Sequence, residues 1–90
     1  MAIAALKIKI MPESPDTDLE KIKKEAEDRI EKLNAKLHSS EEQDIAFGLK
    51  ALILTVAWPE EREQSEIEDS LQSISGVQSA EVIDFRRAIG

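Results

Sequence analysis

The chain has 90 residues, of which 41% are hydrophobic and 34% are charged, a balance typical of a globular protein rather than a disordered one. It contains no cysteine, which excludes disulfide bonds and thiolate metal sites, and its formal net charge of -7 argues against general binding to nucleic acid. Because the chain is short and no apolar run approaches the roughly 20 residues of a membrane span, we expect residues 1–90 to form a single soluble domain. The lack of cysteine suits a reducing compartment, so we expect a cytoplasmic protein.

The first predicted element is a strand over residues 4–10. Apolar side chains occupy every second position there, and the positions between them are small or charged. The apolar set is Ala4, Leu6, Ile8 and Ile10, and the other set is Ala5, Lys7 and Lys9. This period of two predicts a strand with one buried face. The segment 11–15 contains two prolines, which cannot donate to a ladder, so we expect the strand to stop there.

A helix is predicted after this strand. Pro15 suits a first helical position after Ser14, while Thr17 and Glu20 offer a competing capping box. Apolar residues then recur at steps of three and four, and they are Leu19, Ile22, Ala26, Ile30 and Leu33. This stripe predicts an amphipathic helix, and the acidic and basic residues on its opposite side are typical of a solvated face.

Two strands are predicted between residues 35 and 59. Leu37 is the one large apolar residue in 35–44, which is typical of an exposed edge strand guarded by charged residues. In residues 51–58, both the odd-numbered and the even-numbered positions are mostly apolar, so both faces of the strand are apolar. This pattern indicates a central strand that is buried on both faces. Pro59 ends this run.

A second helix and a last strand complete the chain. Ser65 and Glu68 form a second potential capping box. The apolar face of the helix that follows consists of Ile67, Leu71 and Ile74. Gly76 lies where a left-handed helix terminus is expected, and residues 77–87 alternate as the last strand.

The order strand, helix, strand, strand, helix, strand predicts an α+β fold, the ferredoxin-like βαββαβ sandwich. Right-handed crossovers place both helices on one face of a four-stranded antiparallel sheet and leave the other face open. On this assignment Ile53, Ile83 and Phe85 are expected on the helix-free face.

The chain offers little for a chemical site. Its one histidine, His38, has no cysteine partner, and a metal site needs three or four converging ligands. Ser39 and Ser40 follow it, but neighbouring strand residues point to opposite faces, so no catalytic triad is placed. The three glycines lie too far apart for a phosphate-binding loop. We expect no metal, no cofactor and no enzymatic activity.

The segment 45–50 is unusual because a Phe-Gly pair, Phe47-Gly48, falls at the junction of two predicted strands. One interpretation is a hairpin turn with Phe47 folded back onto the core. The other is an exposed aromatic anchor for a protein partner, since aromatic rings concentrate binding energy. The sequence leaves both open.

Three segments of the chain resemble the archaeal translation elongation factor 1-beta family and the exchange domain at the C-terminal end of the eukaryotic factor. They are Met11-Pro12-Glu13-Ser14-Pro15-Asp16, Ile45-Ala46-Phe47-Gly48-Leu49-Lys50-Ala51-Leu52 and residues 82–87. The resemblance covers nearly the whole chain, and the Ala-Phe-Gly-Leu-Lys part is its most specific feature. Residues 1–90 are thus identified as one guanine-nucleotide exchange domain of this family.

The resemblance implies that the chain binds the GTPase elongation factor 1-alpha and speeds the release of GDP, so that GTP can replace it. In the family an aromatic residue of the Phe-Gly loop contacts the GTPase, and a basic residue near the C-terminus reaches toward its magnesium site. Phe47 matches the first position and Arg87 the second, where the eukaryotic pattern has lysine. The residues implied to bind the partner are Phe47, Gly48, Lys50, Arg86 and Arg87. If both residues act together at one place on the GTPase, as a single wedge-shaped contact surface, Phe47 and Arg87 must lie close together.

Other functions fit the same strand and helix order. The main alternative is a ferredoxin-like small-ligand-binding regulatory module, although the segment 11–15 is stiff where such modules have a small-residue turn. Single-stranded RNA binding on the open sheet face needs aromatic side chains, and Phe85 is the one aromatic expected there. Pairing of two copies through Ile53, Ile83 and Phe85 is a further possibility, but we expect a monomer and no direct contact with nucleic acid or membrane.

Overall fold

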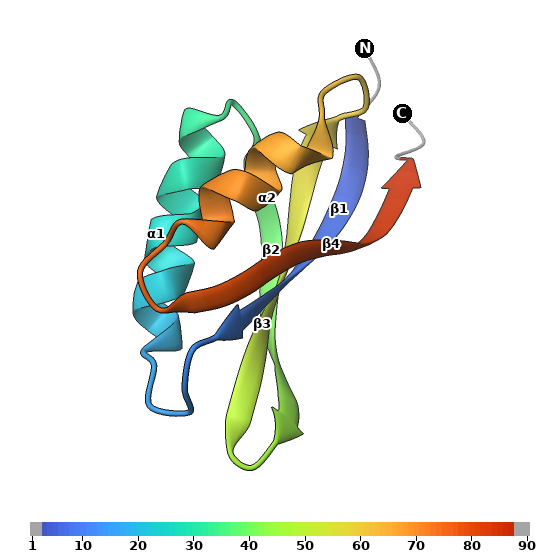
Figure 1. Ribbon diagram of the computed structural model, residues 1–90. Helices are drawn as coiled ribbons and strands as arrows, with labels where there is room; N and C mark the ends of the chain where they lie inside the picture. Colours follow the sequence, from blue (N-terminus) through green and yellow to red (C-terminus); the bar gives the residue numbers. More distant parts are fainter. Residues whose placement is uncertain (1–2, 88–90) are drawn as a thin grey trace.

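The computed structural model describes residues 3–87, which form a four-stranded sheet covered on one face by two helices (Figure 1). The elements in chain order are β1 (Ile3–Pro12), α1 (Leu19–Lys32), β2 (Lys36–Ala46), β3 (Leu49–Pro59), α2 (Gln64–Gln72) and β4 (Val77–Arg87). The strand order is β2-β3-β1-β4, and each neighbouring pair is antiparallel. The predicted ferredoxin-like α+β fold is confirmed. Within residues 3–87, neither helix has the length and apolar character that a membrane crossing requires.

The core lies between the sheet and the two helices. The predicted inner positions of β1 are all fully buried, as are alternate residues of β3 up to Trp58. Ile22, Ala26 and Ile30 of α1 and the apolar residues of α2 close this core from the other side. Because every second residue of β1 and β3 faces the helices, the sequence periodicity alone predicted which strand face is buried.

The helix starts differ from the sequence prediction. The α1 N-cap is Asp18, whose Oδ1 accepts from the backbone N–H groups of Glu20 (3.1 Å) and Lys21 (3.3 Å). We predicted that the helix starts with Pro15 as its first residue or with Thr17 as its N-cap, and both predictions are wrong. Thr17 instead closes a turn ahead of the helix, where its Oγ1 accepts from the N–H of Ser14 at 3.2 Å.

The capping box predicted for α2 is wrong as well. Glu63 is the N-cap and makes no side-chain capping bond, and Ser65 lies inside the helix. Glu68 turns toward the sheet, where its Oε2 accepts from the backbone N–H of Val82 at 2.8 Å. The loop before α2 is fixed by Trp58, whose indole Nε1 donates to the carbonyl of Arg62 at 3.3 Å. This contact holds the loop ahead of the helix, and α2 itself begins without a side-chain cap.

An irregularity in β4 changes which face its last residues occupy. Ile8 pairs with Val82 and Lys7 pairs with Asp84, so Ile83 is an extra residue in a β-bulge. Beyond the bulge Phe85 pairs with Leu6, and directly paired residues project to the same face of a sheet. Phe85 therefore lies on the face of Leu6, which is the helix side, and its predicted place on the open face is wrong.

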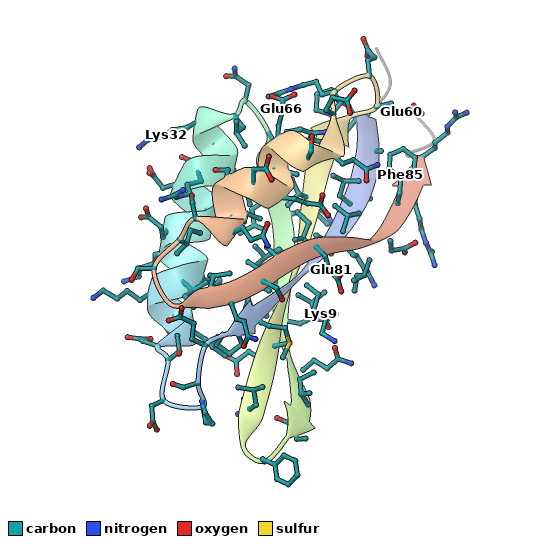
Figure 2. All side chains as sticks on the ribbon, in the orientation of Figure 1. Lys9, Lys32, Glu60, Glu66, Glu81 and Phe85 are labelled. Atoms are coloured by element: carbon teal, nitrogen blue, oxygen red, sulfur yellow. The ribbon has the colours of Figure 1, made fainter. Side chains whose placement is uncertain are left out.

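The open face consequently carries less apolar surface than the sequence suggested. Ile53, which pairs with Lys9, lies on this face as predicted but is only 5% exposed. Ile83, at 47% exposed, is the one of the three predicted residues that is both on this side and open to solvent. Charged residues of neighbouring strands share the face, among them the paired Lys9 and Glu81 (Figure 2). The three residues therefore do not form an apolar patch for a second copy.

Candidate functional site

The turn between β2 and β3 projects an aromatic ring into solvent. β2 ends at Ala46 and β3 begins at Leu49, so Phe47 and Gly48 form a two-residue loop. Their φ angles are 53° and 78°, and positive φ at both central residues is the requirement of the type I′ hairpin turn. Phe47 is 100% exposed. The interpretation in which its ring folds onto the core is therefore wrong.

The conformation of Phe47 itself points to a function. A non-glycine residue in the left-handed region costs about 1–3 kcal/mol, and bulky residues are rare there. Because the ring is fully exposed, its burial against residues 3–87 does not offset this cost. Asn-Gly would form the same turn with less strain. An exposed aromatic ring is a candidate anchor for a protein partner, because a few large side chains carry most of the binding energy at interfaces.

The base of this turn meets the loop that joins β1 to α1. Gly48 and Lys50 line a hollow of about 220 Å³ together with residues of that loop and of the first turn of α1. The loop and helix residues are Pro12, Ser14, Pro15, Thr17 and Leu19. Two of the three segments that carry the family resemblance, 11–16 and 45–52, thus meet at one end of the molecule. Lys50 contributes a positive charge there, and its Nζ lies 3.8 Å from Oε1 of Glu42.

Arg86 and Arg87 lie at the last two described positions of β4. The Nε atom of Arg87 is 2.7 Å from Oε1 of Glu60, which follows the end of β3. The Nε atom of Arg86 is 3.2 Å from Oδ2 of Asp84, two residues earlier on the same strand. Both arginine side chains are largely exposed, so their guanidinium groups are accessible to a partner.

The two predicted contact regions are not close together. Arg87 pairs with Ala4, and Ala4 pairs with Trp58 near the end of β3, whereas Phe47 precedes the start of that strand. Eleven residues of extended chain separate Phe47 from Trp58, which corresponds to roughly 36 Å at about 3.3 Å per residue. The molecule is 41 Å along its longest axis. In Figure 2, Glu60 and Phe85 mark the end opposite the β2–β3 turn. The expectation that Phe47 and Arg87 form one compact wedge is therefore wrong.

No catalytic cluster is formed by the residues that the sequence analysis considered. Ser39 pairs with Thr55 and Ser40 pairs with Leu54, so the two hydroxyls lie on opposite faces of the sheet. Among residues 3–87, no group of three or more histidine, cysteine or acidic side chains is arranged to hold a metal ion. With Phe85 on the helix side and Trp58 buried in the core, the described part of the open face also lacks an aromatic platform for stacking bases.

Glu60 is the residue near the candidate site that sequence reasoning missed. β3 and β4 both run antiparallel to β1, so they are parallel to each other and their C-terminal ends lie at the same end of the sheet. An acidic residue directly after β3 is therefore placed beside a basic residue at the end of β4. The signal was available, because Glu60 follows Pro59 at a predicted strand end and the predicted fold fixes that topology.

Comparisons with known proteins match nearly the whole chain. Residues 5–88 match the family model described as EF-1 guanine nucleotide exchange domain. The chain is 48% identical over 81 residues to a protein named elongation factor 1-beta from Methanothermobacter thermautotrophicus, covering 89% of this chain and 90% of the relative. It is 44% identical over 89 residues to a protein of the same name from Methanosarcina barkeri, covering 97% and 99%.

Among solved structures, the full extracellular region of zebrafish Gpr126/Adgrg6 is similar to this chain with a TM-score of 0.51. The match covers 96% of this chain and 13% of that one, at 10% sequence identity. Similarity at this level of identity concerns the fold alone.

Proposed function

The chain belongs to the family of EF-1 guanine nucleotide exchange domains, and from this premise we propose that it is the exchange factor of translation elongation factor 1-alpha. It promotes GDP release so that GTP can bind, and it acts as a regulator of the GTPase rather than as a catalyst of a chemical reaction. The observation that carries the proposal within the structure is Phe47, which is fully exposed and held in a positive-φ turn. We place this action in the cytoplasm, where translation takes place, and propose that residues 1–90 act as one domain and as a monomer.

The β2–β3 turn is the proposed anchor. Phe47 enters an apolar pocket of the GTPase, and burial of its ring supplies binding free energy that the free protein does not use. Gly48 permits the backbone conformation that presents the ring, since its φ is 78°. Lys50, at the base of the turn, adds a positive charge for an acidic group of the partner. The hollow beside Gly48 and Lys50 accommodates partner side chains that surround the anchor.

The end of β4 is the proposed site of action on the nucleotide. A GTPase holds Mg²⁺ against the phosphates, and the metal offsets their negative charge. The Arg87 guanidinium, with Arg86 beside it, is brought toward this region and competes electrostatically with the metal. Arginine stays charged and offers several donors, so it performs the cationic role that the eukaryotic pattern gives to lysine.

Because the anchor and the arginines lie roughly 36 Å apart along the sheet, we propose that they contact two separate surfaces of the GTPase. The turn at one end fixes the position of the protein, and the opposite end then delivers the guanidinium. This replaces the single wedge expected from sequence. A rigid sheet suits the task, since β3 spans the distance and is hydrogen-bonded on both sides.

Thermodynamic linkage requires the coupling between this protein and the nucleotide to be reciprocal. If the exchange factor lowers the affinity of the GTPase for GDP, bound GDP lowers the affinity for the exchange factor by the same factor. GTP that enters the nucleotide-free complex therefore helps to displace the exchange factor. The net charge of -7 favours approach to a basic translation factor and disfavours approach to RNA.

The test is a nucleotide-release assay. The GTPase is loaded with fluorescent GDP, this protein and excess GTP are added, and the loss of fluorescence is timed. Faster release with increasing protein supports the proposal, whereas unchanged release at saturating protein contradicts it. The alternative of a small-ligand-binding regulatory module is tested by a thermal-shift screen with amino acids, in which a specific ligand raises the melting temperature.

A further inference from the structure

An ion pair at the end of the sheet joins a residue with no assigned role to the proposed acting residue. Nε of Arg87 and Oε1 of Glu60 are 2.7 Å apart, the shortest of the ion pairs in residues 3–87. The two residues are 27 positions apart in sequence and meet because β3 and β4 end at the same edge. The pair is thus a product of the tertiary fold.

The two members of the pair differ in how firmly they are held. The Glu60 side chain is 18% exposed, whereas that of Arg87 is 80% exposed. Glu60 lies in a tight turn in which the N–H of Arg62 donates to the carbonyl of Pro59 at 3.1 Å. Trp58 fixes the same turn, because its indole donates to the Arg62 carbonyl and its ring lies 4.4 Å from the Arg62 guanidinium carbon. The Glu60 backbone is therefore held in this turn and its side chain is mostly buried, whereas the Arg87 guanidinium is the solvent-exposed partner.

Arg86 makes a useful contrast. Its partner Asp84 lies on the same strand two residues away, and the Asp84 side chain is itself 38% exposed. Oδ1 of Asp84 also accepts from the N–H of Phe85 at 3.0 Å. This contact is local and solvated, and it does not tie Arg86 to another part of the fold. Within residues 3–87, Arg87 alone of the two arginines is connected to the rigid β3–α2 turn.

We propose that Glu60 is a positioning residue that orients the Arg87 guanidinium for its contact with the GTPase. The inference rests on the proposed function. Arginine has a long side chain that loses much rotamer freedom when it is fixed, and restricting it before binding reduces that loss in the complex. The contact with Glu60 is made through Nε, and the exposed remainder of the guanidinium stays available to the partner.

The test compares two substitutions that remove the same charge from adjacent positions. Glu60→Ala removes the pair, and Glu61→Ala is the matched control, because Glu61 is exposed and follows directly in the same turn. In the nucleotide-release assay, Glu60→Ala lowers the maximal release rate about two- to fivefold, the range expected for an exposed ion pair, and Glu61→Ala stays near wild type. The concentration of half-maximal effect, which reports the anchor at the other end, changes little in either variant.

A double substitution separates positioning from an independent structural effect. In the Arg87→Ala background, Glu60→Ala causes no further loss, because the guanidinium that it orients is already gone. Circular dichroism and thermal melting check that each variant remains folded. A second measurement needs no partner: the Arg87 Nε–H resonance of the free protein, observed by NMR, shifts in Glu60→Ala because the nearby carboxylate is lost, but not in Glu61→Ala.

The outcomes are distinguishable. If wild-type protein does not accelerate GDP release, the proposed function fails and the role of Glu60 fails with it. If wild-type protein is active but Glu60→Ala behaves like Glu61→Ala, the positioning role is overturned and the exchange function stands. The positioning role is likewise overturned if Glu60→Ala still lowers the rate in the Arg87→Ala background, or if the Arg87 Nε–H resonance is unaffected by loss of Glu60.

Discussion

Phe47→Asn is expected to stabilise the free protein and to impair exchange. Asparagine tolerates the left-handed region far better than phenylalanine, and Asn-Gly is a preferred pair for the type I′ turn seen at residues 47–48. Because the Phe47 ring is fully exposed, its removal forfeits no burial in the free chain. Relief of about 1 kcal/mol of backbone strain raises the melting temperature by about 4–8 °C for a domain of this size.

The effect on the complex has the opposite sign. Burial of a phenylalanine side chain contributes about 2–3 kcal/mol, and about 1.4 kcal/mol corresponds to a tenfold change in affinity. The concentration of Phe47→Asn that gives half-maximal GDP release is therefore expected to rise about 30- to 150-fold. Titration of the variant into GTPase loaded with fluorescent GDP measures this concentration, and thermal unfolding followed by circular dichroism measures the stability.

The anchoring role of Phe47 is refuted if Phe47→Asn exchanges nucleotide like the wild type. The strain assigned to the turn is refuted if the melting temperature falls, because the turn would then gain stability from the aromatic side chain. Ile83→Ala is the control, since it removes an exposed apolar side chain from the open face, away from the turn, and is expected to leave exchange unchanged.

Two further predictions concern stability and are measured by urea unfolding. Asp18→Ala removes the N-cap of α1 and is expected to lower the free energy of unfolding by about 1 kcal/mol. Ser65→Ala, at the capping position suggested by sequence, is expected to change it by less than about 0.5 kcal/mol. Equal losses in the two variants would contradict the observed caps. Gly76→Ala is expected to lower the free energy of unfolding more than Gly48→Ala. Both positions have positive φ, so both substitutions are strained. In addition, a Cβ at Gly76 would lie 3.1 Å from a threonine methyl carbon, whereas nothing lies within 4 Å of a Cβ at Gly48. A larger loss of stability for Gly48→Ala would contradict this prediction, because it would mean that the neighbouring threonine side chain moves away from Gly76 at little cost.

Local periodicity was sufficient for the main elements. The alternation along residues 4–10 predicted the buried face of β1, and the stripe from Leu19 to Leu33 predicted that of α1. Residues 51–58, apolar at both sets of positions, correctly indicated the central strand β3, which has a neighbour on each side. The Phe-Gly pair located the turn, because positive φ favours glycine. These features depend on neighbours within a few residues, which the sequence displays directly.

The positions of functional groups relative to one another depended on the tertiary structure. The bulge at Ile83 moved Phe85 to the helix side, because one extra residue reverses the alternation of a strand. The separation of Phe47 from Arg87 follows from the register of three strands. The Glu60–Arg87 pair exists because two parallel, non-adjacent strands end at one edge. Sequence determined the elements and the kinds of residue they carry, whereas register and strand order decided which residues meet, since pairing between distant segments is set by the packing of the whole sheet.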